Sequence, residues 1–350
     1  MPFTENEIDK FTVTKGDLLV CEGGDIGRSA IWNFDEEIRI QNHLHRLRPY
    51  GRIYTKFYYY IMYLYKANGR INGNGIGLQG LSSNALHKII VPVPPIEEQK
   101  RIVNNITSVL SLLEQIESQK QSLSSQIDNI KSKILDLAIR GKLVPQDPND
   151  EPASVLLERI RAEKEELIKQ GKIKRDKKES VIFKGDDNSY YEKYGEKLPK
   201  GWVVTNFETL LSYEQPTNYI VKDTNYKNEY KTPVLTAGKS FILGYTNEKD
   251  NIFSELPVII FDDFTTESKF VNFPFKVKSS AMKILHINTD FVLPKFVYYL
   301  MQATEIDHEN HQRYWISTYS QEIVGLPPIS EQKRILSTLE YYFDLLDKLI

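Results

Sequence analysis

The chain has 350 residues, of which 41% are hydrophobic and 26% charged, a composition typical of a folded protein of about two or three domains. Its 45 basic and 47 acidic side chains give a net charge of −2, so any nucleic-acid binding must come from local patches. The single cysteine, Cys21, excludes an internal disulfide and suits a reducing cytoplasmic compartment. The start, MPFTENEIDK, does not resemble a signal peptide, and no stretch approaches the roughly 20 apolar residues of a membrane span.

A nine-residue sequence occurs twice, as PPIEEQKRI from Pro94 and PPISEQKRI from Pro327, with eight identical positions at a separation of 233 residues. The apolar positions downstream repeat at the same separation. Upstream, KFYYYIM from Lys56 corresponds to KFVYYLM from Lys295 at a separation of 239. Solenoid units are only about 20–50 residues long, so this period indicates two copies of a domain-sized module, each ending in the same element.

Residues 1–93 combine strand-like runs such as GDLLVCEGG with glycine-rich turns such as NGRINGNGIG, and we predict an irregular β-rich domain here. In the second copy Trp202 precedes Pro327 by 125 residues, whereas only 93 residues precede Pro94. If the two copies share one plan, the first domain is incomplete and lacks its opening strands.

From Ile96 the pattern becomes helical. Apolar residues alternate in steps of four and three, interrupted once, at Ile102, Ile106, Val109, Leu113, Ile116, Leu123, Ile127, Ile130, Ile134 and Leu137. This 3.5-residue repeat predicts a helix of roughly 65 Å with a narrow apolar seam that packs against another long helix. Gly141 is the expected C-cap, and a second, charged helix is predicted between Pro152 and Gly171. The basic run KIKRDKKES then completes a helical spacer region over residues 94–197.

Residues 198–328 begin with LPKGWVV and alternate strand-like runs with polar turns, which predicts a second β-rich domain. Residues 329–350 repeat the start of the long helix for just over two heptads. By comparison with the first copy, we expect this second spacer to be truncated.

The linked order of several motifs carries a resemblance over nearly the whole chain. PPIEEQKRIV leads into the long helix, RGKLVPQDPNDEPASVLLERI follows it, and LPKGWV opens a domain that contains PVLTAGKSFILGYT and PVIIFDDFTTESKFVNFPFKVKSSAMKIL. Together they resemble the specificity subunit of a type I restriction–modification system. The resemblance implies an α+β fold in which two β-rich target-recognition domains, the first incomplete, alternate with long antiparallel coiled-coil spacer helices.

The resemblance further implies a non-catalytic, DNA-binding subunit that reads a bipartite site, one half by each recognition domain. The spacers would hold modification (methyltransferase) subunits, two in number, and a restriction subunit in a cytoplasmic complex. S-adenosylmethionine, ATP and Mg would be bound by those partners and no cofactor or metal by this chain. An approximate two-fold axis would let the domains face successive grooves of double-stranded DNA in equivalent poses, with spacer length setting the distance between half-sites.

Several patterns that suggest enzyme chemistry are weak. Asp263, Glu267 and Lys269 could bind a metal as in a nuclease, but their spacing is too tight for the separate strands of such sites, and a turn between two strands is favoured. HENH from His308 lacks the His-Glu-x-x-His spacing that places two zinc-binding imidazoles on one face of a helix. NGNGIG from Asn72 matches no phosphate-binding loop. No Asn/Asp-Pro-Pro-Tyr motif of an adenine methyltransferase occurs.

Base reading requires paired donors and acceptors on loops that project from a rigid sheet. Loops of the second domain supply the candidates Lys239, Ser240, Lys278, Ser279, Ser280, His311, Arg313 and Tyr314. Those of the first domain supply Arg28, Arg70, Asn72, Asn74 and Gln79. Lysines favour phosphates, whereas arginine, asparagine and glutamine can discriminate bases. For each residue the alternative is a solvated loop position.

The repeated EEQKR and SEQKR lie in the first turn of each spacer helix, where an acidic side chain suits the positive end of the helix. Their simplest role is to start the helix. The alternative is two equivalent partner-docking sites, formed by Glu98, Gln99, Lys100, Arg101, Glu331, Gln332, Lys333 and Arg334.

Two other functions fit the same sequence. A recombined or truncated half-subunit could act as a homodimer through its spacer, or be an inactive allele. A coiled-coil scaffold that binds only protein belongs to a different class.

Overall fold

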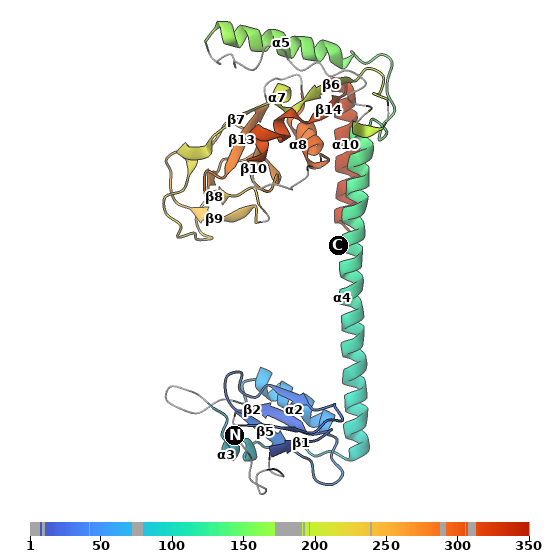
Figure 1. The fold of residues 1–350 in the computed structure, drawn as a ribbon, viewed down its shortest axis with the longest axis vertical. Helices are drawn as coiled ribbons and strands as arrows, with labels where there is room; N and C mark the ends of the chain where they lie inside the picture. Colours follow the sequence, from blue (N-terminus) through green and yellow to red (C-terminus); the bar gives the residue numbers. More distant parts are fainter. Residues whose placement is uncertain are drawn as a thin grey trace. The chain divides into compact units, whose positions relative to one another are not determined.

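The structure is a computed structural model that describes the chain except residues 1–7, 9–10, 42, 72–79, 172–190, 192, 196, 239, 288–291, 305, 307–312 and 350. The chain divides into two compact units, Met1–Gln121 and Ser122–Ile350 (Figure 1). The division falls inside α4 (Ile96–Ile139), an uninterrupted helix of 44 residues that confirms the helical prediction. No helix in the described residues combines the length and apolarity needed to cross a membrane.

Unit 1 contains, in chain order, β1 (Thr12–Val13), β2 (Leu18–Cys21), β3 (Ser29–Ile31), β4 (Ile38–Arg39), β5 (Leu44–Leu47), α2 (Thr55–Ala67), α3 (Ser83–His87) and the first part of α4. Its main sheet is antiparallel, with β2 between β3 and β5. The core joins this sheet to α2 and the α3 region through Leu18, Val20, Met62, Ile71, Leu81 and Leu86.

Unit 2 contains, after the end of α4, α5 (Ala153–Lys169), β6 (Val203–Asn206), α7 (Phe207–Leu210), β7 (Leu211–Glu214), η1 (Pro216–Tyr219), β8 (Thr232–Leu235), β9 (Ile242–Thr246), β10 (Val258–Asp262), β11 (Ser268–Val271), β12 (Lys276–Val277), β13 (Met282–Ile287), α8 (Pro294–Gln302), α9 (Tyr314–Ser317), η2 (Tyr319–Gln321), β14 (Ile323–Leu326) and α10 (Ile329–Asp347). The strands form a four-stranded antiparallel sheet, β11-β10-β13-β7, a three-stranded sheet, β12-β8-β9, and the pair β14-β6. The fold is therefore mixed helix and sheet, as predicted.

The sequence repeat is also a structural repeat. Leu18 pairs with Ile31 across β2 and β3 as Val258 pairs with Val271 across β10 and β11, each residue being 240 positions later. The three strands β3-β2-β5 thus correspond to β11-β10-β13. α2 and α8 carry the two copies of the KF-aromatic sequence that follows these sheets.

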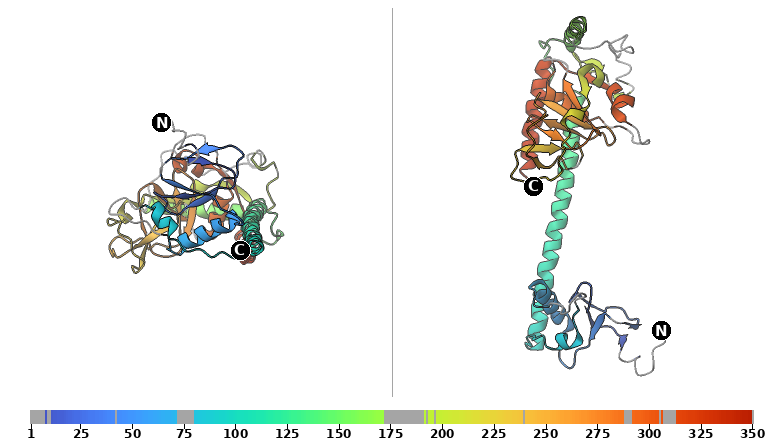
Figure 2. Two further views of the ribbon diagram at one scale, coloured as in Figure 1. Left: turned by 90° about the horizontal axis from the view of Figure 1, so that it is seen from below. Right: turned by 90° about the vertical axis from the view of Figure 1, so that its left-hand side faces the viewer.

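The end of α4 packs against α10 in unit 2. The Lys131 ammonium contacts Asp347 near the last turn of α10 and lies 5.5 Å from the Phe343 ring centroid, and both views show the two helices side by side and antiparallel (Figures 1 and 2). The seam is uneven along α4: Ile127 is 1% exposed, whereas Val109 and Ile116 are 55% and 59% exposed.

Gly141 ends α4 as predicted. Its φ of +65° is the left-handed conformation that glycine adopts most easily, and Lys142 N–H donates back to the Leu137 carbonyl at 2.8 Å. The glycine also lies close to Trp202, because a Cβ there would be 3.0 Å from the indole ring. The helix end is thus attached to the segment that opens the second β-rich domain.

Candidate nucleic-acid interface

Two of the predicted DNA-binding loops of unit 2 leave neighbouring strands at the same end. β12 runs parallel to β8, with Val277 opposite Leu235, and Lys278 N–H donates to the Leu235 carbonyl at 3.1 Å. Parallel neighbours end on the same edge of a sheet. The segments that follow β8 and β12 therefore emerge side by side, and their polar residues Ser240, Lys278, Ser279 and Ser280 are exposed.

Asp263 ties the third predicted segment to the same edge. Its N–H donates to the Ala281 carbonyl at 3.2 Å, and its carbonyl accepts the Tyr314 N–H at 2.9 Å. Its carboxylate Oδ1 accepts the Trp315 N–H at 3.0 Å. The exposed Arg313, which immediately precedes these two residues, is thereby held next to the loop that carries Ser279 and Ser280.

A buried ion pair supports this connection. Lys283 Nζ lies 3.4 Å from Asp263 Oδ2, and the two side chains are 1% and 4% exposed. The Lys283 ammonium also lies 5.0 Å from the Tyr213 ring centroid. A buried charge that loses its partner is strongly destabilising, so the pair fixes the distance between β10 and β13 at the edge where the loops emerge.

The sequence DDFTTESK forms the predicted turn between two strands. Asp262 Oδ1 accepts the N–H groups of Phe264 and Thr265, both at 2.9 Å, and β10 and β11 pair on either side. Among the described residues, no group of three or more His, Cys, Asp or Glu side chains could hold a metal ion. Phe264 is 37% exposed at this turn and is a further candidate, which the sequence prediction did not include although a phenylalanine within a polar turn is a visible signal.

Two predicted DNA-binding arginines of unit 1, Arg28 and Arg70, flank the close contact between Gly27 and Ile71. Gly27, with φ +76°, packs so closely on Ile71 that a Cβ would be 2.8 Å from Cγ2 of that side chain. Arg28 and Arg70 are the adjacent residues of the two segments, and both are exposed. Arg28 Nε is 3.8 Å from Asp25 Oδ2 in the turn between β2 and β3, which corresponds to the turn after β10.

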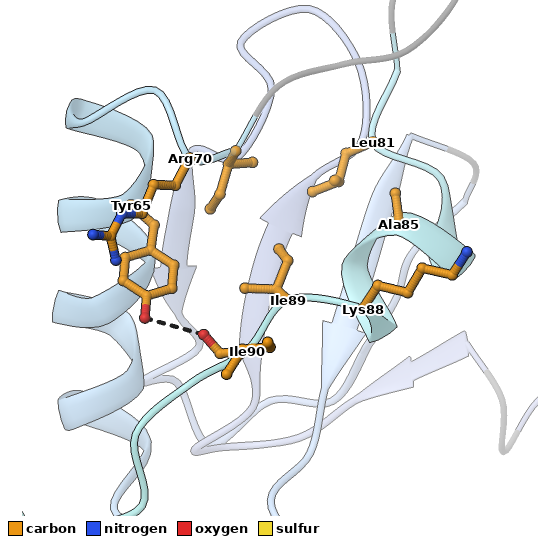
Figure 3. Close-up of a pocket in the computed structure, with 8 residues that line it drawn as sticks. Tyr65, Arg70, Leu81, Ala85, Lys88, Ile89 and Ile90 are labelled. Carbon is orange, nitrogen blue, oxygen red and sulfur yellow. Dashed lines mark hydrogen bonds between the residues drawn. The ribbon is translucent and has the colours of Figure 1, made fainter.

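Arg70 also borders a cavity of about 460 Å³, where its guanidinium lies 5.2 Å from the Tyr65 ring centroid (Figure 3). Five predicted DNA-binding residues lie outside the described residues: Lys239, His311, Asn72, Asn74 and Gln79.

The prediction for Tyr314 is wrong. Its side chain is 2% exposed and belongs to the interior of unit 2. The corresponding residue 233 positions earlier is Leu81, also 2% exposed, whose N–H donates to Glu22 just as Tyr314 N–H donates to Asp263. The position is a core position in both copies, and burial keeps the tyrosine ring away from any DNA.

The docking prediction is wrong for the two repeated glutamines, which are 0% exposed. Gln99 Oε1 accepts the Tyr54 N–H at 2.9 Å, and its Nε2 donates to the Pro94 carbonyl at 2.8 Å. Gln332 makes the equivalent bonds with Leu293 and Pro327, both at 3.0 Å. Tyr54 and Leu293 are the N-caps of α2 and α8, which have no side-chain cap of their own. These junction glutamines therefore satisfy a helix-start N–H that would otherwise be unpaired.

The second copy of the repeat is also used internally at its glutamate and arginine. Glu331 is 1% exposed, so docking is excluded for it, and its Oε2 accepts the Trp202 indole N–H at 3.0 Å. Burial raises the pKa of the Glu331 carboxyl, although the indole hydrogen bond acts in the opposite direction. Arg334 Nη2 contacts Asp150 Oδ2 at 2.6 Å. The other docking candidates, Glu98, Lys100, Arg101 and Lys333, are exposed, and their role in docking stays a prediction.

Comparison with known proteins agrees with this organisation. The family model described as the type I restriction modification DNA specificity domain matches residues 2–124. The specificity subunit of the type I restriction enzyme EcoR124I/EcoR124II of Escherichia coli is 44% identical over 165 residues, 46% of this chain and 40% of that protein. The EcoAI specificity subunit of the same species is 31% identical over 220 residues, 50% of this chain and 34% of that protein.

The chain is therefore similar to type I restriction–modification specificity subunits, and the match to their DNA specificity domain lies in residues 2–124. Solved structures show that the chain shares the fold of such subunits. A crystal structure of the HsdS subunit from Thermoanaerobacter tengcongensis has a TM-score of 0.51 at 13% identity, with 97% of this chain and 75% of that chain covered. A chain from a structural study of complex assembly in the type I R-M system has a TM-score of 0.54 at 15% identity, with 97% and 76% covered. Matches to the curated relatives named above span less than half of their length.

Proposed function

We propose that this specificity subunit is a non-catalytic DNA-binding protein that reads a bipartite double-stranded site, one half with each unit. The observation that carries the proposal is the single edge of unit 2 at which the segments after β8 and β12 and the residue Arg313 meet. Exposed polar side chains on such an edge can enter a groove while the sheet behind them stays rigid.

The side chains at this edge suit different contacts. Lys278 offers a point charge to a phosphate, and Arg313 offers the paired donors that recognise guanine. The exposed ring of Phe264 provides an apolar surface that can contact a thymine methyl group. In unit 1, Arg28 and Arg70 would supply the corresponding paired donors to guanine.

The specificity subunit would act inside an assembly, as the names of its relatives indicate. We propose that two modification subunits and a restriction subunit bind to it, and that S-adenosylmethionine, ATP and Mg are bound by those subunits. The exposed Lys100 and Lys333, at equivalent places in α4 and α10, are our candidates for contacts with the two modification subunits.

A salt titration of duplex DNA binding tests the proposal directly. The logarithm of the binding constant should fall linearly with the logarithm of salt concentration, and Lys278→Ala should reduce the slope by roughly one unit. Lys200→Ala, an exposed lysine elsewhere in unit 2, is the matched control and should leave the slope unchanged. Absence of DNA binding even with modification subunits present would refute the proposal and favour a protein-only scaffold.

Co-expression with a modification subunit, followed by mapping of methylated adenines, then tests how the units are used. A two-part asymmetric site is expected if both units read DNA. A palindromic site would instead show one unit used twice in a homodimer.

A further inference from the structure

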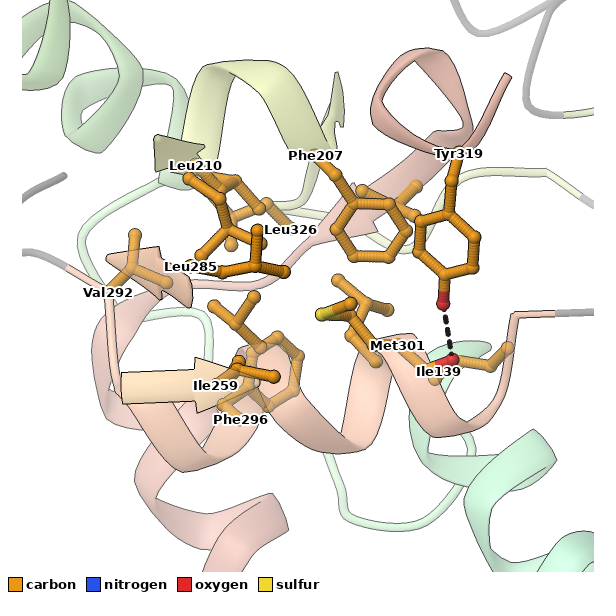
Figure 4. Close-up of a cluster of buried hydrophobic side chains, with 14 of the residues drawn as sticks. Ile139, Phe207, Leu210, Ile259, Leu285, Val292, Phe296, Met301, Tyr319 and Leu326 are labelled. Carbon is orange, nitrogen blue, oxygen red and sulfur yellow. Dashed lines mark hydrogen bonds between the residues drawn. The ribbon is translucent and has the colours of Figure 1, made fainter. Parts of the chain in front are cut away.

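In unit 2 the repeated junction is covered by one continuous segment, residues 201–210, of sequence GWVVTNFETL. Its strand β6 pairs antiparallel with β14, and Val324 and Leu326 of β14 are both 0% exposed. The Trp202 indole bonds Glu331, and the ring of Phe207 in α7 stacks on Tyr319 at 5.3 Å (Figure 4).

In unit 1 no segment among the described residues covers the same junction. Ile90–Val93 precede Pro94 as β14 precedes Pro327, at the separation of 233 residues. No described residue pairs with Ile90–Val93 as a strand. Ile90 is 89% exposed and Val93 68% exposed, in contrast to the buried Leu326 that corresponds to Val93. A strand-like segment with exposed apolar side chains is a template for pairing with another strand.

The backbone of this segment is oriented for such pairing. Tyr65 Oη donates to the Ile90 carbonyl at 3.0 Å (Figure 3). Tyr58 Oη donates to the Pro92 carbonyl at 3.1 Å. Both tyrosines belong to α2, so these two carbonyls face α2, and in an extended segment the peptide groups of Val91 and Val93 face away from it. The missing N–H of Pro92 falls on the α2 side, where an added strand does not need it.

A cavity continues the uncovered surface. The cavity of about 460 Å³ is lined by Leu81, Ala85, Lys88, Ile89 and Ile90, among others (Figure 3). At the corresponding place in unit 2, the Phe207 ring of α7 stacks on the Tyr319 ring of η2.

The charges around the cavity also match those of the segment that covers unit 2. Lys88 corresponds to Gln321, whose side chain donates to the Glu208 carboxylate of α7. An acidic residue carried by a segment of the same pattern would therefore meet an ammonium group in unit 1.

Two side chains of α4 complete the surface. Glu98 and Arg101 are exposed, and neither has an ion-pair partner among the described residues. Their counterparts Glu331 and Arg334 are bonded to Trp202 and Asp150. The two charged groups at this helix start thus each have a bonded partner in unit 2, whereas those of unit 1 are exposed.

We infer that this surface of unit 1, formed by Ile90–Val93, the adjoining cavity, Glu98 and Arg101 and called here the open junction, is a docking site for a strand-and-turn segment of another polypeptide. The segment that fits has the pattern of residues 201–210. Its strand adds to Val91 and Val93, its indole N–H bonds Glu98, its phenylalanine enters the cavity and its acidic residue pairs with Lys88.

A fluorescein-labelled peptide with the sequence of residues 197–210, KLPKGWVVTNFETL, tests the inference when titrated with the full chain and followed by fluorescence anisotropy. We expect saturable binding with one peptide per chain. Val93→Asp and Glu98→Gln should each weaken it by about ten-fold, the order expected for the loss of one buried contact. Glu97→Gln is the matched control, because Glu97 lies in the same helical turn and pairs with Lys100 at 2.9 Å.

Three results would overturn the inference. The first is no saturable binding. The second is binding that survives both Val93→Asp and Glu98→Gln but is lost with Glu331→Gln, which would show the peptide exchanging into unit 2. The third is equal binding of a peptide in which the tryptophan and phenylalanine are alanine. Val93 and Glu98 are exposed, so circular dichroism should show unchanged folding for both variants.

Discussion

Replacement of the junction glutamine Gln332 by alanine should selectively destabilise unit 2. The side chain is 0% exposed and bonds the N–H that starts α8 and the carbonyl that precedes α10. Truncation leaves the part-buried Leu293 N–H and the buried Pro327 carbonyl without this partner. Each such group costs roughly 1–3 kcal/mol, so the free energy of unfolding of unit 2 should fall by roughly 2–6 kcal/mol.

The assay must report on unit 2 alone, because a chain with two compact units need not unfold in a single transition. Trp32 is the tryptophan of unit 1, whereas Trp202 and Trp315 belong to unit 2. In a Trp32→Phe background, tryptophan fluorescence during urea unfolding therefore follows unit 2. Lys333→Ala, at the exposed neighbouring position, is the matched control and should change the free energy by no more than about 0.5 kcal/mol.

A fall for Gln332→Ala as small as that of the control would refute the reasoning, since it would mean that neither backbone group depends on the glutamine. Gln99→Ala provides the reciprocal measurement in unit 1. Hydrogen exchange in α2 should rise for Gln99→Ala and remain unchanged for Gln332→Ala, because each glutamine caps only its own helix.

Three further outcomes are expected. Lys283→Met leaves Asp263 buried and unpaired and should destabilise unit 2 by roughly 3–5 kcal/mol in the same fluorescence assay, whereas adding Asp263→Asn should restore part of the loss. Gly141→Ala places a Cβ 2.7 Å from a proline ring at positive φ and should lower the same unfolding free energy by roughly 1–3 kcal/mol. Burial opposes ionisation of Asp17, but hydrogen bonds from Arg48 and the Thr14 N–H outweigh it and hold the pKa of Asp17 below its usual value. The stability that Asp17 gives unit 1 is therefore present above about pH 3.9 and lost as pH falls through the lowered pKa; acid unfolding followed by Trp32 fluorescence should lose this dependence in Asp17→Asn.

The parts of the fold that could be predicted from sequence are those coded by local pattern. The heptads of α4, the glycine that ends it and the hairpin turn at Asp262 depend on residues close together in the chain. The junction glutamines could not be placed in this way. A polar run such as EQKR has the composition of an exposed helix start, and the burial of Glu331 depends on Trp202, which lies 129 residues away.

The same limit applies to the proposed DNA contacts. The sequence predicts the segments after β8 and β12 as separate loops, because their adjacency depends on a parallel pairing that no sequence spacing reveals. For Tyr314 the sequence wrongly predicts exposure, because the stretch around it is charged and aromatic. The structure instead bonds its backbone N–H to Asp263 and buries its ring. Arg313 remains exposed because it precedes the bonded residues.

The repeat supplies an internal control that separates folding from binding. The two glutamines make the same bonds in both units, so intramolecular structure accounts for each of them. Among the described residues, the glutamate and arginine of the same run have bonded partners in unit 2 but not in unit 1, although the run opens both helices. Folding of unit 1 therefore explains Gln99 and leaves Glu98 and Arg101 unexplained. Together with the exposed Ile90 and Val93, this places the unmet interactions of unit 1 on one surface, which is the reason to look for a partner segment there.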